Sequence, residues 1–161
     1  MNKVRTGDAV ITISNLLVRI FTAESFSHVG IILVEDEIPY VVETHESIDN
    51  TRKILLKDWL KQYEKVYVGR PVLHIRRHRD KIEDKIYEYL EKPVSQKKYG
   101  YFTLPLVWLN QIFPKRKMPH KLNVCSTFVQ EMWNSTGWKF GRLMDPGDVA
   151  IEGCDLLRRI K

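Results

Sequence analysis

Apolar and polar positions follow two different periods in the first half of the chain. β-branched residues dominate Ala9–Ile13, directly after a turn signal, and this pattern is typical of a short strand. Residues 15–23 instead place apolar side chains on one face at helical spacing, which predicts a helix. Residues 27–34 and 40–45 are strand-like again, and the short acidic link between them predicts an antiparallel hairpin.

The pattern changes after Asn50. Residues 56–62 predict a short helix, and residues 65–68 and 72–75 predict two further strands, because each is a brief apolar run with a high β-propensity. The first half of the chain is therefore expected to form several short antiparallel strands.

Two amphipathic helices are the clearest elements of the second half. In Arg79–Glu91 apolar residues recur at helical spacing, and Pro93 ends the pattern. Residues 124–135 form the second helix, with Asn123 expected at its N-cap and Gly137 just past its C-terminal end. Short strands framed by helices indicate an α+β fold.

The chain is expected to form a single domain over residues 1–161. No internal repeat, low-complexity tract or Gly/Ser linker divides it. A chain of 161 residues can bury a core without disulfides or a metal. Apolar residues make up 43% and charged residues 29%, which excludes a disordered chain and a bundle of membrane helices.

Three features bear on location. The uncharged run of residues 9–18 is preceded by Asp8, is ended by Arg19 and has no small-residue cleavage site after it, so it is interpreted as structure rather than as a signal peptide. The longest uncharged run, residues 99–114, is too short to span a bilayer. Two cysteines are too few for a disulfide framework and suit a reducing compartment, which predicts a cytoplasmic protein.

The net charge of +6 permits attraction to phosphates, anionic lipid or acidic polymers, and it says nothing about the fold. Basic residues gather loosely in residues 70–79 and 115–121. No aromatic stacking pattern or nucleic-acid motif accompanies them, so both clusters are interpreted as solvated surface. A non-catalytic module that binds a polyanion is the weakest hypothesis, and nucleic acid is not an expected partner.

Cys125 is the first candidate for chemistry. It falls in the opening turn of the predicted helix 124–135, where free N–H groups and the positive end of the helix dipole favour a thiolate. The alternative is that Cys125 is a small buried apolar residue, as most cysteines are. From its position alone, the interpretation of Cys125 as a buried apolar residue is favoured.

His28 and its neighbours on the hairpin change the balance. Since side chains alternate along a strand, the loop length decides what faces His28. A two-residue loop at residues 35–36 places Glu43 opposite His28, and a four-residue loop places His45 opposite it with Glu43 diagonal. An odd loop presents Thr44 or Val42 instead. Either even register puts an acceptor beside the imidazole, where a carboxylate would fix the tautomer and favour the imidazolium.

Cysteine at a helix start, histidine on one strand and a polar group on the next strand are the parts of a cysteine nucleophile system. Their chain order is histidine, acid, cysteine. This order and the local sequence resemble the circularly permuted papain-like group, which includes YiiX-like proteins and is related to NlpC-type cell-wall peptidases and lecithin:retinol acyltransferase-like enzymes. The resemblance rests on Gly7-Asp8, residues 26–31 (FSHVGI), Val42-Glu43, residues 97–101 (KKYGY), residues 125–129 (CSTFV) and residues 145–148 (DPGD).

The resemblance implies a permuted papain-like fold, in which a small antiparallel sheet or barrel packs against helices and the nucleophile begins a helix. It implies that Cys125 is the nucleophile, His28 the general base and then acid, and Glu43 the residue that orients His28. The implied reaction is hydrolysis or transfer at an amide or ester through a thioester. Val124 departs from the aromatic residue often found before the cysteine, which leaves only the Cys125 N–H as an expected oxyanion donor.

Other residues with reactive side chains are expected to be inert. Cys154 has no helix start to activate it. His74, His78 and His120 lack partners at metal-ligand spacing, so neither a metal nor another cofactor is predicted.

The leading hypothesis is an amidase- or peptidase-like cysteine hydrolase with a Cys125–His28–Glu43 triad. Its substrate would be a small molecule, a peptide or an acyl lipid. Residues 101–113 are crowded with apolar side chains, which fits a buried helix or lid. With the basic residues 115–117 behind them, they would equally suit an acyl-chain wall or peripheral contact with anionic lipid, and the alternative function is a lipid-directed acyltransferase or lipase.

Overall fold

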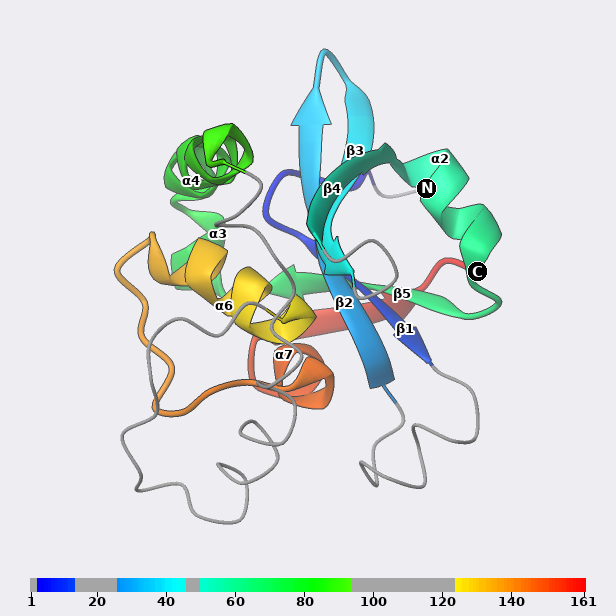
Figure 1. Cartoon of the computed structure of the whole chain (residues 1–161). Coiled ribbons are helices and arrows are strands. Elements are labelled where there is room, and N and C mark those ends of the chain that lie inside the picture. The colour runs from blue at the N-terminus through cyan, green and yellow to red at the C-terminus, as the bar shows by residue number, and fades with distance from the viewer. Residues whose placement is uncertain (1–2, 14–25, 46–49, 94–123) are drawn as a thin grey trace.

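The protein is a mixed α+β structure built on an open six-stranded antiparallel sheet (Figure 1). The computed structural model describes residues 3–13, 26–45, 50–93 and 124–161. Across the sheet the strand order is β4-β3-β2-β1-β5-β6, and every neighbouring pair is antiparallel. The strands are β1 (Ala9–Ile13), β2 (Phe26–Glu35), β3 (Ile38–His45), β4 (Asn50–Leu55), β5 (Val66–Pro71) and β6 (Cys154–Arg159).

Helices lie on both sides of this sheet (Figure 1). α3, α4, α6 and α7 gather on one side, and α2 with the short 3-10 helix η2 lies on the other. The helices are α2 (Leu56–Trp59), η2 (Leu60–Gln62), α3 (Leu73–Arg76), α4 (Arg79–Glu91), α6 (Cys125–Asn134) and α7 (Pro146–Ile151).

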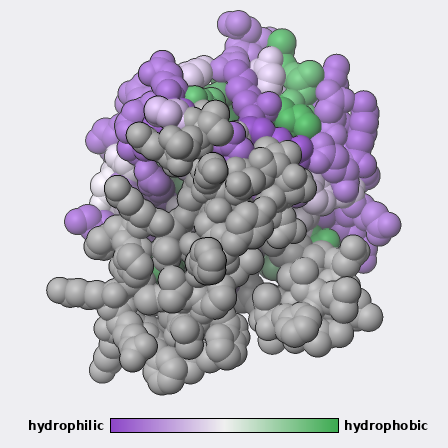
Figure 2. Space-filling view, viewed as in Figure 1, coloured by the Kyte–Doolittle hydropathy of each residue, from purple (hydrophilic) through white to green (hydrophobic). Residues whose placement is uncertain are grey.

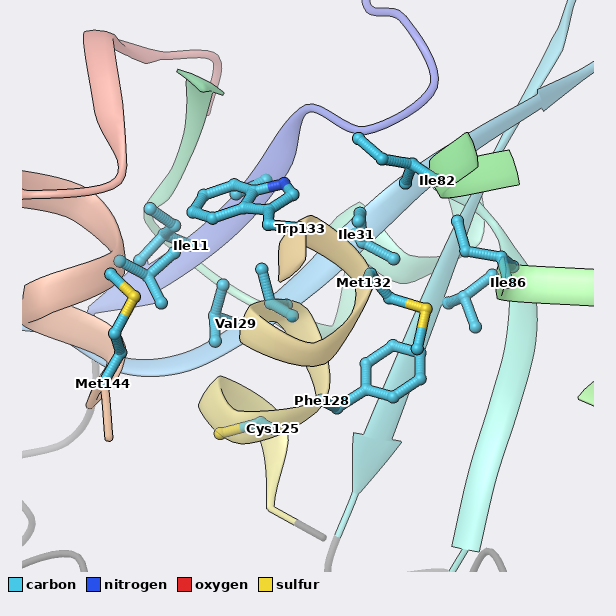
Figure 3. Packing of buried hydrophobic residues seen from close by; sticks show 14 of the residues in the cluster. Ile11, Val29, Ile31, Ile82, Ile86, Cys125, Phe128, Met132, Trp133 and Met144 are labelled. Carbon is cyan, nitrogen blue, oxygen red and sulfur yellow. The ribbon is translucent and has the colours of Figure 1, made fainter. Parts of the chain in front are cut away.

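Each face of the sheet buries its own apolar cluster, because successive side chains of a strand point to opposite faces. Val29 and Ile31 of β2 pack with α4, α6 and α7, whereas Ile32, the residue after Ile31, and its β3 neighbour Val41 pack with Trp59. Figure 3 shows the larger cluster, in which the apolar side of α6 lies over the sheet. Its largest fully buried side chains are Trp133, Phe128, Ile11, Ile31, Leu33, Ile75, Ile82, Ile86, Met132 and Met144.

Polar contacts hold the turn that precedes β1 in place. Asp8 is fully buried, and its carboxylate accepts hydrogen bonds from Arg79 Nη2 at 2.9 Å and from the Arg5 backbone N–H at 3.1 Å. Gly7 supplies the left-handed backbone of the turn, with φ of 86°, and its carbonyl accepts from Trp133 Nε1 at 3.0 Å. The turn thus connects β1 to α4 and α6. These contacts fix the position of α6, the helix that begins with Cys125, relative to the sheet.

Most of the predicted elements are confirmed. The strand Ala9–Ile13 and the helix Arg79–Glu91 have the expected bounds, and the hairpin and the two helical stretches beginning near residues 56 and 124 are present. The helix predicted over residues 15–23 lies outside the described residues, as do residues 101–113, His120 and Asn123.

Two expectations about elements are wrong, and two strands were missed. Residues 72–75 do not form a strand, because after Pro71 the chain turns into α3, in which the Arg76 N–H donates to the Val72 carbonyl at 3.1 Å. The N-cap of α6 is Val124, not Asn123. The edge strands β4 and β6 were not predicted, because charged residues interrupt their apolar pattern.

On the face shown in Figure 2, the described surface is mainly hydrophilic, with small groups of hydrophobic residues near its upper edge. Among the described residues, no helix is both long and apolar enough to cross a membrane.

Candidate active site

The β2–β3 hairpin brings His28 and Glu43 to the same region of the sheet. Its turn consists of two residues, Asp36 and Glu37, with φ of 47° and 66°, and the strands pair from Glu35↔Ile38 to Ile31↔Val42. Continuing that register places His45 opposite His28 and leaves Glu43 diagonal. This is the register expected for a four-residue loop. Two residues suffice for it because the turn begins one position later than expected.

Gly30 makes room for the Glu43 side chain. The register places Gly30 opposite Glu43, and a Cβ atom added at Gly30 would lie 2.7 Å from Val41 Cγ1 and 3.3 Å from Glu43 Cβ. Any larger residue would therefore displace the strand that carries the carboxylate.

The Glu43 carboxylate has no solvent exposure, and donors from three other elements surround it. Oε2 lies 2.7 Å from His28 Nε2 and accepts from Trp59 Nε1 at 2.5 Å. Oε1 accepts from Arg52 Nε at 2.7 Å and pairs with Arg52 Nη2 at 2.6 Å. Each oxygen is thus held in place, and the carboxylate plane is fixed relative to the imidazole.

These contacts keep Glu43 ionised. Burial by itself would raise its pKa, but the hydrogen bond and charge of His28, with the hydrogen bonds of Trp59 and Arg52, lower the pKa to about 2. At neutral pH the group is therefore an anion, which can stabilise a cation on His28.

His28 in turn interacts with Cys125. The histidine side chain is only 14% exposed, and burial alone would lower its pKa. The charge and hydrogen bond of Cys125, followed by the hydrogen bond and charge of Glu43, instead raise the His28 pKa to about 10. Because Nε2 is engaged with Glu43, Nδ1 is the ring nitrogen left for the sulfur.

Cys125 begins α6, and Figure 3 shows it at the start of that helix, where Phe128 and Met132 follow toward the core. Its side chain is buried. The N-cap residue, Val124, has no side chain that can accept a hydrogen bond, so it leaves the first-turn N–H groups uncapped. Thr127 holds the turn instead, since its hydroxyl accepts from the Val124 N–H at 3.0 Å. The positive end of the helix is therefore directed at the sulfur and at any anion formed beside it.

Two aromatic rings enclose His28. Tyr63 stacks on the imidazole, with ring centroids 6.1 Å apart and planes 18° apart. His45, the residue opposite in register, meets it edge-on at 5.0 Å. Of these neighbours of His28, Glu43 is the one that contacts Nε2, at 2.7 Å.

Two residues of this site, Arg52 and Trp59, were not predicted from the sequence. Arg52 lies directly opposite Glu43 in the β3–β4 register, so recognition of β4 as a strand would have suggested the pair. Trp59 reaches Glu43 from α2, and no local spacing signals that contact.

The other candidate residues lie apart from this cluster. Cys154 starts β6, where its sulfur packs over Gly69, and burial, followed by the charges of Asp8 and Asp155, raises the pKa of its thiol. His74 is bonded to the Thr136 carbonyl at 3.2 Å. Within the described ranges, no group of three or more His, Cys, Asp or Glu side chains is placed to hold a metal ion.

Comparison with solved structures finds a similar fold. No family model and no curated protein matches the chain. The crystal structure of metalloprotein YiiX from Escherichia coli O157:H7 is similar, with a TM-score of 0.60 and 16% sequence identity over 99% of this chain and 97% of that one. The fold is therefore shared over nearly the whole length of both chains.

Proposed function

We propose that the protein is a cysteine hydrolase of the amidase or peptidase type that cleaves an amide or ester bond through a thioester. The observation that carries this proposal is the 2.7 Å contact between His28 Nε2 and the buried, ionised Glu43, together with the raised pKa of His28, to which Cys125 contributes a charge and a hydrogen bond. A sulfur at a helix start, an imidazole beside it and a carboxylate behind the imidazole are the arrangement that activates a cysteine.

In the first half of the reaction, the Cys125 thiolate attacks the carbonyl carbon of the substrate and a C–S bond forms. The negative charge moves to the carbonyl oxygen, where the Cys125 backbone N–H can donate to it. The His28 imidazolium gives its proton to the leaving nitrogen or oxygen as that bond breaks. Glu43 remains ionised throughout and keeps the ring in one tautomer.

In the second half, neutral His28 accepts a proton from a water molecule that attacks the thioester carbon. The C–S bond breaks, the acid product leaves, and the thiolate–imidazolium pair is restored. The thioester divides one difficult displacement into two easier ones.

We further propose that the fold is the permuted papain-like one. The chain order of the three residues, their placement on β2, β3 and the start of α6, and the similarity to YiiX support this assignment. A cytoplasmic location is part of the proposal, and the two free thiols support it. YiiX is described as a metalloprotein, whereas among the residues that the structure describes in this chain no group of three or more His, Cys, Asp or Glu side chains is placed to hold a metal ion. The proposed steps use protein side chains and water alone.

The test is modification of the two thiols by iodoacetamide at pH 7, followed by mass spectrometry. Cys125 is expected to react at least about tenfold faster than Cys154, because only Cys125 has an imidazole and a helix start beside it. The His28→Ala variant should lose that advantage, whereas His74→Ala should keep it.

Acylation is the second part of the test. Incubation with p-nitrophenyl acetate should add one acetyl group to Cys125, which then disappears by hydrolysis. Equal alkylation of both thiols, together with no acetylation of Cys125, would contradict the proposed function.

A further inference from the structure

Arg52 gives the Glu43 carboxylate a second positive partner. Two of its nitrogens contact Oε1, and its Nη2 also donates to Gln62 Oε1 at 2.8 Å, which fixes the guanidinium. His28 and Trp59 share the other oxygen. The fully buried Glu43 carboxylate carries one negative charge and has two positive partners, Arg52 and protonated His28. Of these two, only His28 takes part in the proposed proton transfer.

This arrangement matters because the reaction requires His28 to alternate between charged and neutral forms. If His28 were the only partner, each loss of its proton would leave a buried carboxylate with no opposite charge, which costs several kcal/mol. The imidazole would then hold its proton too strongly to protonate a leaving group. Arginine remains charged at any pH the protein meets, so Arg52 keeps Glu43 paired in both states.

We propose that Arg52 is a positioning residue that acts on His28 through Glu43, balancing the buried carboxylate so that the imidazole can release and regain its proton. This inference rests on the proposed function for its biological meaning, while its physical content concerns only the three side chains. Among the residues that the structure describes, the other titratable groups facing His28 are Cys125, His45 and Tyr63, the last of which stacks on the ring.

The experiment is a titration of the histidine side chains by nuclear magnetic resonance in the 15N-labelled protein, with the His28 signal assigned from His28→Gln. In Arg52→Met the cation is lost, so the His28 midpoint should rise by about 1 pH unit. Arg76→Met is the matched control, since Arg76 pairs with Asp155 at 2.8 Å outside the site and the net charge changes equally. Its His28 midpoint should stay within about 0.2 units of the original.

Two further variants keep the test decisive if Arg52→Met does not fold. Arg52→Lys retains the charge and should preserve the midpoint, and Arg52→Gln retains amide donors without charge and should shift it upward. An unchanged or lowered midpoint in folded Arg52→Gln, or an equal shift in Arg52→Lys, would overturn the proposal.

Substrate turnover separates this inference from the proposed function. In Arg52→Met, the acetyl group on Cys125 should be hydrolysed several-fold more slowly at pH 7 than in the original protein, because His28 retains its proton. A protein whose Cys125 never becomes acetylated would refute the proposed function. The His28 titration would still decide the role of Arg52.

Discussion

At the scale of single residues, the site depends on keeping a charge where no solvent reaches it. Glu43 achieves this with donors from β2, β4 and α2, so its pKa falls although burial opposes ionisation. The cost of removing one donor exceeds the value of an ordinary hydrogen bond, because the unpaired carboxylate would remain buried.

The Glu43 side chain also needs the space left by the missing side chain of Gly30. This requirement gives a prediction for Gly30→Ala. The added methyl group would press on Val41 and on the Cβ of Glu43, so β3 must shift. We expect a loss of about 1–3 kcal/mol in the free energy of unfolding, measured in urea, and slower alkylation of Cys125.

Gly141→Ala is the matched control for that prediction. A Cβ at Gly141 would meet no atom within 4 Å, so both stability and alkylation should change little. If Gly30→Ala behaved like Gly141→Ala, the close packing around Glu43 would not be a requirement of the site.

Contacts between site residues of the same hairpin could be predicted from the sequence. Contacts that depend only on tertiary packing could not. Parity along the hairpin linked His28 with Glu43, and a helix start distinguished Cys125 from Cys154. The contact of Trp59 with Glu43 depends on how α2 returns over the sheet, which no periodicity encodes.

At the scale of elements, α7 shows how the segment 145–148 (DPGD) acts locally. Asp145 caps the helix by accepting from the Asp148 N–H at 2.7 Å, and the Asp148 carboxylate accepts from the Asp145 N–H at 3.1 Å. Pro146 occupies the first helical turn, where its missing N–H is no loss. The segment 145–148 is one of those on which the family resemblance rests, and in this chain it has a structural role as the N-terminal cap of α7.

This explanation predicts that Asp145→Ala lowers the free energy of unfolding by about 1 kcal/mol, because an acceptor for the first-turn N–H groups is lost. Asp145→Asn keeps an acceptor and should restore most of that stability. Urea unfolding followed by circular dichroism measures both variants. A large decrease in Cys125 alkylation by Asp145→Ala, at unchanged stability, would instead place Asp145 within the reactive site.

The elements that sequence predicted best are those with one clear periodicity. Arg79–Glu91 has it, and so does the hairpin of β2 and β3. The edge strands have open sides and carry charged residues, such as Arg52 and Lys53 in β4, so their alternation is weak. Residues 72–75 have high β-propensity, yet tertiary context folds most of that stretch into α3.

At the scale of the whole molecule, the side chains of the candidate site come from the β2–β3 hairpin and from α6, which are far apart in sequence, so the site exists only in the folded chain. The free energy of the ion pairs is therefore also free energy of folding. A shift in pKa between the unfolded and folded states makes stability depend on pH.

The signs of the two shifts define the pH range of greatest stability. The pKa of Glu43 falls from 4.5 to about 2 on folding, so its contribution is present above pH 4.5 and is lost as the pH falls toward 2. The pKa of His28 rises from 6.5 to about 10, so its contribution is complete below pH 6.5 and is lost as the pH rises toward 10. These shifts predict a stability maximum between about pH 4.5 and 6.5.

Urea unfolding from about pH 6 to about pH 9 should therefore show a decrease on the order of 3 kcal/mol in the free energy of unfolding. The His28→Gln variant should flatten that slope, because it has no imidazolium to lose. His78→Gln removes a half-buried histidine that is bonded to the His74 carbonyl, and it should retain the slope. If the free energy of unfolding had the same slope with pH in all three proteins, the His28 imidazolium between Cys125 and Glu43 would make no contribution to folding. The ionised pair of His28 and Glu43 would then no longer explain how the site stays intact.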